Sequence, residues 1–462
     1  MSAPPSVRVP SSLGAPSSLS APSLGAPGAG PPLERRLGLF GASLFGLSYL
    51  CPTVVVSTFG LIALDSHGAA AAAYLLATLA MLLTAGSYGW MAARHPQAGS
   101  AYLYVARTFR PGGGFLVGWV LLLDYFFVPM VIALFTAKAL EMMVPAIGFR
   151  WWLAAIALGT TLINARGLAL THRVNLAIMG AQLGVLGVLI GCCYRHAASS
   201  GLSLLAPLIG PGAHLKPVLS GASIAAYSFL GFDAVTTLAE ETHAPTRNIP
   251  RATLIAAAVC GLLYVLSAHA LSLAHPALAF ADVDNGGYEV MRSVSGALFP
   301  ALLLVVLIAY GASVMCAQAA SARLLYALAR DGWLPARLPF QRLHARWRTP
   351  LFGLAVVGAI MLIGEAVEVA TAAECVNFGA FCAFFAVNAS ALVSGWRERR
   401  LPGAWRLPAL LGPLLGAAGT LWLLAGLHRP ALIAGALWSV LGLLYFAVRL
   451  DRLRSLRVPL GV

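Results

Sequence analysis

Four acidic residues lie within or at the end of long apolar stretches. Asp124 and Asp233 lie deep in two such stretches, and Glu240 and Glu241 follow at the end of the second. A carboxylate inside a membrane costs several kcal/mol unless it pairs with a cation, takes up a proton or faces water. No basic residue lies at a comparable depth. The four acids therefore predict a path for a cationic substrate or a proton.

Alternatives remain for each acid. Asp124 could be a buried carboxyl group that is hydrogen-bonded to neighbouring helices. Glu240 and Glu241 could instead form surface salt bridges with Arg247 or Arg251, which are close in sequence. We favour the salt bridges for the two glutamates.

Aromatic residues at similar depth could complete a cation site through their ring faces. Candidates by depth are Tyr49, Tyr125, Phe232 and Tyr310. The alternative is ordinary packing, which is the more frequent role of a lone aromatic residue in a membrane helix.

Two apolar stretches are interrupted. Pro52 lacks an N–H group and clashes with the preceding turn, so the stretch Leu-Cys-Pro-Thr at 50–53 predicts a kinked or unwound helix. Gly231 and Asp233 interrupt the other stretch. Paired broken helices in corresponding positions indicate a transporter with inverted repeats, whose freed carbonyls, here at 229–232, line a site near the membrane midplane. The alternative is a proline kink and an unrelated packing glycine.

Composition places these residues in a membrane protein. The 462 residues are 59% hydrophobic and 10% charged, with a mean hydropathy of +0.83, whereas soluble domains have about 45–50% apolar and 25% charged residues. These values exclude a soluble enzyme, a nucleic-acid-binding domain and a disordered regulator. The seven cysteines show no metal-ligand spacing, so we expect neither a metal nor a cofactor. A membrane enzyme would need a nucleophile–base pair or metal cluster, and none is apparent in the sequence.

The expected fold is an all-α polytopic membrane protein with twelve transmembrane helices. A spanning helix needs about 20 apolar residues. Twelve stretches qualify: 38–63, 69–92, 113–140, 151–166, 174–194, 217–239, 252–273, 294–321, 350–370, 374–394, 406–427 and 430–449.

The distribution of basic residues predicts that both termini are cytoplasmic. In that orientation 24 of the 30 Lys and Arg residues lie on the cytoplasmic side, as the positive-inside rule requires. The outer side receives only Lys138, Arg150, Arg195, Lys216, Arg292 and Arg429. The net charge of +14 therefore reports orientation and not nucleic-acid binding.

The stretches divide the chain into four parts. Residues 1–32 consist mostly of Ser, Pro, Ala and Gly, which predicts a disordered cytoplasmic tail. We expect a first five-helix repeat at 33–196 and a second at 197–394. Residues 395–462 would hold helices 11 and 12 and the cytoplasmic C-terminus.

Several motifs resemble the amino acid–polyamine–organocation (APC) superfamily of transporters. The segment SFLGFDAVTTLAEE at 228–241, followed by NIPR at 248–251, resembles its sixth-helix signature. HPQAGSAYLY at 95–104 resembles the loop after the second helix, and SARLLYALARDGWLP at 321–335 resembles the loop after the eighth. The resemblance covers about 36–450. It implies five plus five inverted helices with helices 1 and 6 broken, two additional C-terminal helices, alternating access and proton coupling.

Within the superfamily the chain is most similar to bacterial putrescine importers. The similarity rests on the segments GLSYLCPT at 46–53, LDYFFVPM at 123–130, NFGA at 377–380 and VN at 387–388. Amino acid transporters of this superfamily usually have a glycine-rich break in helix 1 whose N–H groups hold the substrate carboxylate. Pro52 removes one such donor, which favours a substrate without a carboxylate, such as a diamine.

Two positions depart from the family pattern. Proton-coupled amino acid members often have a Lys in helix 5 where this chain has Gln182, so protonation is expected on a carboxylate such as Asp124 or Glu241. The importer pattern also has an acid near the position of Ser57.

The sequence and the resemblance together predict a proton-coupled importer of putrescine or a similar small diamine in the bacterial cytoplasmic (inner) membrane. The alternatives are an amino acid permease for cationic or neutral amino acids, an amine exchanger of the same fold, and a channel. The expected partners are a small cationic substrate, a proton and the lipid bilayer. The predicted substrate-binding residues are Tyr49, Cys51, Pro52, Thr53, Asp124, Tyr125, Phe229, Gly231, Phe232, Asp233, Tyr310 and Asn377. The predicted proton-coupling or gate residues are Asp124, Glu240 and Glu241.

Overall fold

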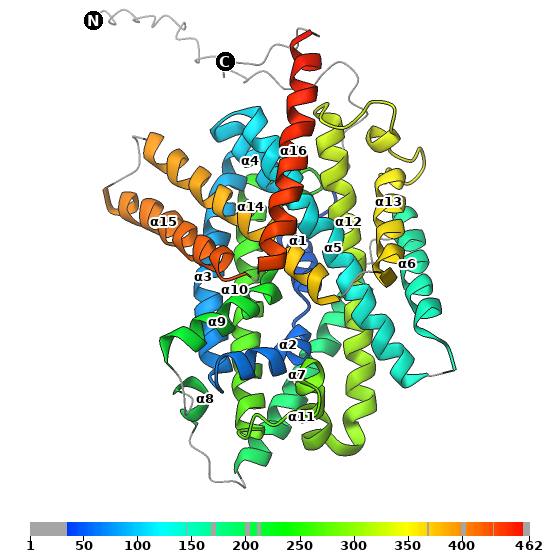
Figure 1. Ribbon diagram of the computed structural model, residues 1–462, viewed down its shortest axis with the longest axis vertical. Coiled ribbons are helices and arrows are strands. Elements are labelled where there is room, and N and C mark those ends of the chain that lie inside the picture. The colour runs from blue at the N-terminus through cyan, green and yellow to red at the C-terminus, as the bar shows by residue number, and fades with distance from the viewer. Residues whose placement is uncertain are drawn as a thin grey trace, which may run out of the picture.

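The computed structural model describes residues 35–144, 146–167, 172–198, 204–209, 214–366, 369–398, 403–427 and 429–455. These residues form a bundle of helices, and none of them belongs to a β-strand (Figure 1). The predicted tail at 1–32 lies outside the described residues.

The helices follow the apolar stretches of the sequence. In chain order they are α1 (Leu39–Leu50), α2 (Val54–Asp65), α3 (Ala70–Arg94), α4 (Ser100–Thr108), α5 (Pro111–Met143), α6 (Phe149–Ala165), α7 (His172–Ala198), α8 (Ala206–Ile209), α9 (Leu215–Ala226), α10 (Pro245–Ala274), α11 (Gly286–Ser295), α12 (Phe299–Arg330), α13 (Leu351–Ile363), α14 (Val369–Arg397), α15 (Gly403–Ala425) and α16 (Arg429–Ser455). Short 3₁₀ segments are η1 (Tyr227–Phe229), η2 (Phe232–Leu238), η3 (Val283–Asn285), η4 (Gly296–Leu298), η5 (Pro339–Gln341) and η6 (Gly364–Ala366).

A helix occupies each of the twelve predicted stretches. Among the described residues, eight helical segments are long and apolar enough to cross a membrane, and α1 with α2 would form a ninth span. The helices α6, α13 and α15 lie at predicted spans, but their apolar segments are too short to be counted among these. The count of twelve therefore stays a prediction. The connecting helices α4 and α11 are not among the predicted elements.

The first predicted break is present between α1 and α2. Cys51 closes α1 with a left-handed backbone (φ 49°), and its N–H donates to the carbonyl of Leu47 at 3.0 Å. Pro52 follows and has no N–H to continue the helical ladder. The two helices are bent by 48° relative to each other.

The second break lies between α9 and η2. Leu230 is extended, and Gly231 has φ +111°, a conformation that residues with a Cβ rarely adopt. A Cβ atom on Gly231 would also lie 2.5 Å from the ring of Tyr49. Glycine is therefore required at this position both by the backbone and by the close approach of α1.

Tyr264 of α10 joins the two breaks. Its hydroxyl lies 2.7 Å from the carbonyl oxygen of Leu50 and 2.9 Å from that of Ser228. Each break frees carbonyl groups from helical bonding, and a buried carbonyl needs another donor. The single O–H group of Tyr264 is shared between the two carbonyls and holds the broken segments side by side.

The broken segments run in opposite directions. The N–H groups of Arg36 and Leu37, just before α1, donate to the carbonyl of Glu241 after η2, at 2.9 and 3.0 Å. At the other end α2 contacts α9. We call the end of the bundle with α4 the α4 end (upper in Figure 1) and the opposite one the α11 end.

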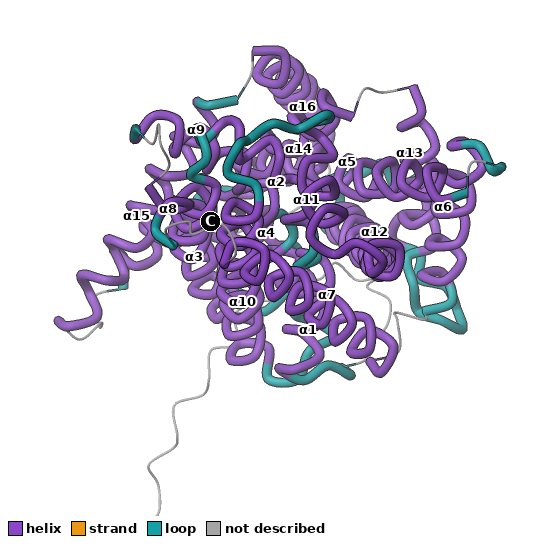
Figure 2. The backbone as a smooth tube through the Cα atoms, turned by 90° about the horizontal axis from the view of Figure 1, so that it is seen from below, coloured by secondary structure: helices purple, strands orange, loops and turns teal. Residues whose placement is uncertain are grey.

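The remaining helices surround this centre. Seen along the bundle in Figure 2, α6 and α13 lie at one edge and α15 at the opposite edge, as in Figure 1. At the α11 end, α11 packs directly on α2, where a Cβ on Gly287 would lie 1.9 Å from the carbonyl oxygen of Val56. The two backbones touch there, so α11 covers the broken span from that side.

Candidate functional site

Asp233 and Asp124 are both buried, with 0% and 1% of their surface exposed. The hydroxyl of Tyr125 donates to Oδ2 of Asp233 at 2.9 Å, and Oγ of Ser100 donates to the same oxygen at 3.3 Å. Oδ1 of Asp233 and Oδ1 of Asp124 make no hydrogen bond to any described residue. Each carboxyl group therefore keeps an oxygen that can bind a cation or a proton.

The two carboxyl groups belong to one cluster. Tyr125, which binds Asp233, is the residue after Asp124 on α5. Tyr49 packs against Gly231, two residues before Asp233. The structure therefore brings together five of the predicted residues, from α1, α5 and the second break.

Asn377 lies on α14, the helix that packs on α5 next to Asp124. Two residues later, Gly379 contacts α5 so closely that a Cβ atom would lie 2.9 Å from the backbone nitrogen of Asp124. Oδ1 of Asn377 is buried and has no partner within the described part of the chain.

In the first break, Cys51 contacts helix α7. Sγ of Cys51 lies 3.3 Å from Oγ1 of Thr53 and 3.5 Å from Oε1 of Gln182, which is fully buried. Few N–H groups are free here. Pro52 has none, Val54 donates to Cys51 at 2.8 Å, and Val56 donates to Thr53 at 3.0 Å. The break therefore offers fewer N–H donors for a carboxylate than an uncapped helix start would.

Two predicted aromatic residues pack on other rings. The ring of Phe229 meets that of Tyr264 edge-on at 5.2 Å between centroids. Phe232 contacts Tyr88 at 5.5 Å and Phe384 at 5.0 Å. These contacts match the packing alternative for Phe232.

Tyr310 lies in a cluster of hydroxyl groups that joins α2, α11 and α12. Its hydroxyl bonds to Ser57 and lies 3.3 Å from the hydroxyl of Tyr288, which is 3.0 Å from Ser57. The cluster ties the α11-end half of the first broken span to two other helices.

Glu240 and Glu241 form ion pairs with α12. Glu240 binds Arg330 at 2.7 Å, and Glu241 binds Arg323 through Nε at 2.7 Å. The glutamates thus pair with arginines of α12 and not with the predicted partners Arg247 and Arg251, which are exposed at the start of α10, so that predicted pairing is wrong. Proximity in sequence misled the prediction because α12 crosses next to the end of η2.

The ion pairs extend into a network at the α4 end. Arg330 also lies 3.4 Å from Asp331, which accepts a hydrogen bond from Tyr102 at 2.8 Å. The N–H of Ala98 donates to Glu240 at 3.1 Å. The network, which we define as Glu240, Glu241, Arg323, Arg330 and Asp331, thus joins η2, α12 and the segment before α4.

We expect the pair Arg323–Glu241 to stabilise the protein measurably, because its side chains are only 16% and 24% exposed. R323Q and E241Q should each lower the melting temperature of the purified protein, and the double variant should lower it by less than the sum. The coupling should be about 1 kcal/mol.

The matched control is the pair Arg150–Glu365, whose side chains are 80% and 38% exposed. R150Q and E365Q should show almost no coupling, because exposed ion pairs contribute little. Equal coupling in the two pairs would contradict the expectation.

Sequence reasoning missed several residues of the site. Ser100, which contacts Asp233, lies in the loop motif at 95–104 that carries the family resemblance. That motif could have indicated a role for Ser100. No sequence feature indicated the role of Tyr264, because it is one aromatic residue in an apolar helix. Arg323 and Arg330 lie in the motif at 321–335, but nothing in it indicates their partners.

Comparison with known proteins finds transporters that are similar over most of this chain. A family model described as amino acid permease matches residues 38–448. The low-affinity putrescine importer PlaP of Escherichia coli (strain K12) is 35% identical over 425 residues, covering 90% of this chain and 93% of that protein. The branched-chain amino acid permease BcaP of Bacillus subtilis (strain 168) is 24% identical and covers 90% and 92%.

A solved structure shows the same fold. The nucleobase-cation-symport-1 family transporter Mhp1, in a closed conformation with bromovinylhydantoin bound, superposes with a TM-score of 0.53 at 15% sequence identity. The match covers 90% of this chain and 96% of Mhp1. The family model and the relatives confirm the resemblance predicted from the motifs, and together with the apolar helices they identify a multi-pass protein of the bacterial inner membrane. The chain therefore belongs to the amino acid permease family of transporters.

Proposed function

We propose that this protein is a secondary active transporter that imports putrescine or a similar small diamine, coupled to protons, by alternating access. The observation that carries the proposal is the buried pair Asp124 and Asp233, each with a carboxyl oxygen that no described residue occupies. Two carboxyl groups suit two ammonium groups, because a charge-assisted hydrogen bond to each offsets the cost of burying both partners.

The first break supports a substrate without a carboxylate. Val54 and Val56 already use their N–H groups within the turn, and Pro52 has none. An α-amino acid would need donors at this helix start for its carboxylate. A diamine needs carbonyl and carboxylate oxygens, which the second break and the aspartates supply.

The proposed topology is twelve spans with both termini inside, divided into repeats at 33–196 and 197–394 and a C-terminal part at 395–462. The antiparallel course of the two broken segments supports the repeat. The α4 end is the cytoplasmic side, because the arginine-rich segments lie there. Each positive charge that moves into an inside-negative cell gains about 2.3 kcal/mol per 100 mV, so the membrane potential favours import.

Asp233 and Asp124 are buried, so neither carboxyl group is open to solvent. We propose that the ion-pair network closes the cytoplasmic path to them and that the packing of α11 on α2 closes the outer path. We propose that release of substrate inward requires separation of Glu240 and Glu241 from α12, while a proton on Asp124 or Asp233 weakens the hold on the second ammonium group.

The test is uptake of labelled putrescine into vesicles that carry the purified protein, with and without an imposed inward proton gradient. We expect uptake to rise with the gradient and unlabelled putrescine to compete better than arginine or isoleucine. Absence of putrescine uptake at micromolar concentration would refute the proposal. Uptake that is independent of the proton gradient but requires an amine inside the vesicles would indicate an exchanger.

The second candidate is an amino acid permease, since BcaP is similar over 90% of this chain. It predicts the opposite order of competition in the same vesicles. With labelled isoleucine or arginine in place of labelled putrescine, the unlabelled amino acid would then compete for uptake and putrescine would not.

A further inference from the structure

We propose that the loop between α12 and α13 binds the headgroup of an anionic phospholipid from the adjoining membrane surface. The loop, residues 331–350, carries four exposed arginines, which we call the arginine patch: Arg337, Arg342, Arg346 and Arg348.

The charge of the arginine patch is uncompensated. Across the described residues, none of its four side chains forms an ion pair. The only acid in the loop is Asp331, and it is engaged by Arg330 and Tyr102. An excess of positive charge next to a membrane helix attracts anionic lipids.

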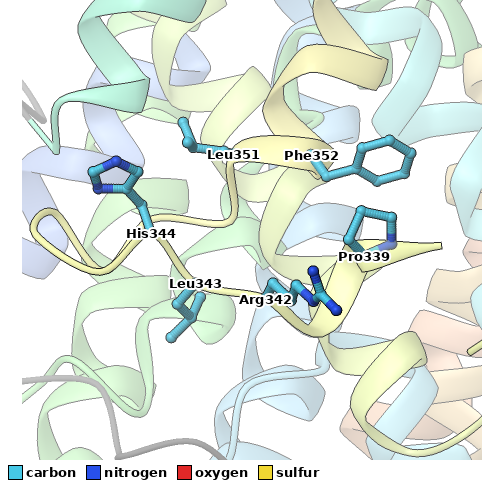
Figure 3. A pocket seen from close by; sticks show the side chains of 6 residues that line it. All are labelled: Pro339, Arg342, Leu343, His344, Leu351 and Phe352. Carbon is cyan, nitrogen blue, oxygen red and sulfur yellow. The ribbon is translucent and has the colours of Figure 1, made fainter. Parts of the chain in front are cut away.

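A cavity lies within the patch. Its volume is about 200 Å³, and its walls are Pro339, Arg342, Leu343, His344, Leu351 and Phe352. Figure 3 shows Leu351 and Phe352, at the start of α13, across from Leu343 and Arg342 of the loop. The walls are mostly apolar and include the side chains of Arg342 and His344, which suits the apolar part of a lipid whose phosphate group is bound by the exposed arginines beside it.

The loop is held in shape by contacts within it and with α6 and α13. Phe340 is buried edge-on against Phe352 at 4.7 Å, and the rings of His344 and Trp347 stack at 4.3 Å. Oγ1 of Thr349 donates to the carbonyl of Ala165 at the end of α6, at 2.8 Å. A preorganised site loses less entropy on binding than a mobile loop would.

Apolar groups on the same loop point to a lipid and not to a soluble anion. Trp347 is 37% exposed and Leu338 is 42% exposed, beside the arginines. Tryptophan is enriched where membrane proteins meet the headgroup layer. The loop also joins two helices at predicted spans, which places it next to that layer.

The experiment measures binding of dioctanoylphosphatidylglycerol to the full-length protein in neutral detergent by native mass spectrometry. We expect R342Q to weaken binding about 5-fold. The quadruple variant R337Q/R342Q/R346Q/R348Q should weaken it more than 10-fold. Dioctanoylphosphatidylcholine, which has no net charge, should bind the wild type and the quadruple variant equally weakly.

The matched control removes four basic residues of the opposite end, in K138Q/R195Q/K216Q/R292Q, all of which are exposed. It should bind the anionic lipid like the wild type. Equal losses in both quadruple variants would overturn the proposal, since only net charge would then matter. Displacement of the lipid by equimolar glycerol phosphate would also overturn it, because a soluble anion would then be the ligand. Size-exclusion profiles identical to that of the wild type show that the variants are folded.

Discussion

D233N is expected to lower putrescine uptake at least about 100-fold at unchanged amounts of protein in the membrane. The carboxylate of Asp233 is fully buried, and its Oδ1 is available to an ammonium group. An amide of the same size leaves that ammonium buried without a counter-charge. Removing one partner of a buried ion pair costs about 3–5 kcal/mol, which corresponds to 100-fold or more. The measurement is the initial rate of labelled putrescine uptake in vesicles, normalised to protein.

Asp65 supplies a matched control. It ends α2, and its Oδ2 is buried without a partner among the described residues, yet it belongs to neither break. D65N should transport at nearly the wild-type rate, whereas D124N should lose uptake to a degree comparable to D233N. Normal transport by both D233N and D124N would show that the carboxylate assignment is wrong. Loss in D65N alone would place the cation elsewhere on the first broken span.

The sequence predicted the helices and both breaks because their causes are local. The length of an apolar run predicts a helix, and Pro52 and the combination of Gly231 with Asp233 mark interruptions within two such runs. The same locality explains the omissions. Helices α4 and α11 have 9 and 10 residues, so they are too short to register as spans.

Contacts between distant segments could not be read from the sequence in the same way. Glu241 and Arg323 are 82 residues apart, and Ser100 and Asp233 are 133 apart. The depth of Asp233 in an apolar run showed that it needs a partner, but not that Tyr125 and Ser100 provide one. Likewise, the depth of Phe232 could not distinguish a ring that faces a ligand from one that packs on Tyr88.

The arrangement explains why a single glycine matters to both broken spans. Gly231 brings the second break against Tyr49 at the end of α1, and Tyr264 holds the carbonyls of both breaks. Asp233 follows two residues later, so its carboxyl group is positioned by the same backbone. A change at Gly231 should therefore affect folding and transport together.

G231A is expected to reduce putrescine uptake about 10-fold or more and to lower the melting temperature by several degrees. Alanine at φ +111° is strained by about 1–3 kcal/mol. Its Cβ would in addition lie 2.5 Å from the ring of Tyr49, well inside the 3.5–4.0 Å at which carbon atoms normally meet. The break must widen to admit it, which moves Asp233 away from Tyr125. Uptake and thermal unfolding of the purified variant measure the two effects.

G159A controls for the substitution itself. Gly159 lies within α6, and a Cβ there would meet no atom within 4 Å. Alanine is preferred to glycine inside a helix by about 0.5–1 kcal/mol, so this variant should melt at the same temperature or slightly higher and should transport normally. A lower melting temperature in G231A together with an unchanged or higher one in G159A is expected only if the backbone at Gly231 is as strained and as closely packed as described. If G231A instead transports and melts like G159A, the second break does not have this geometry, and the placement of Asp233 beside Tyr125 fails with it.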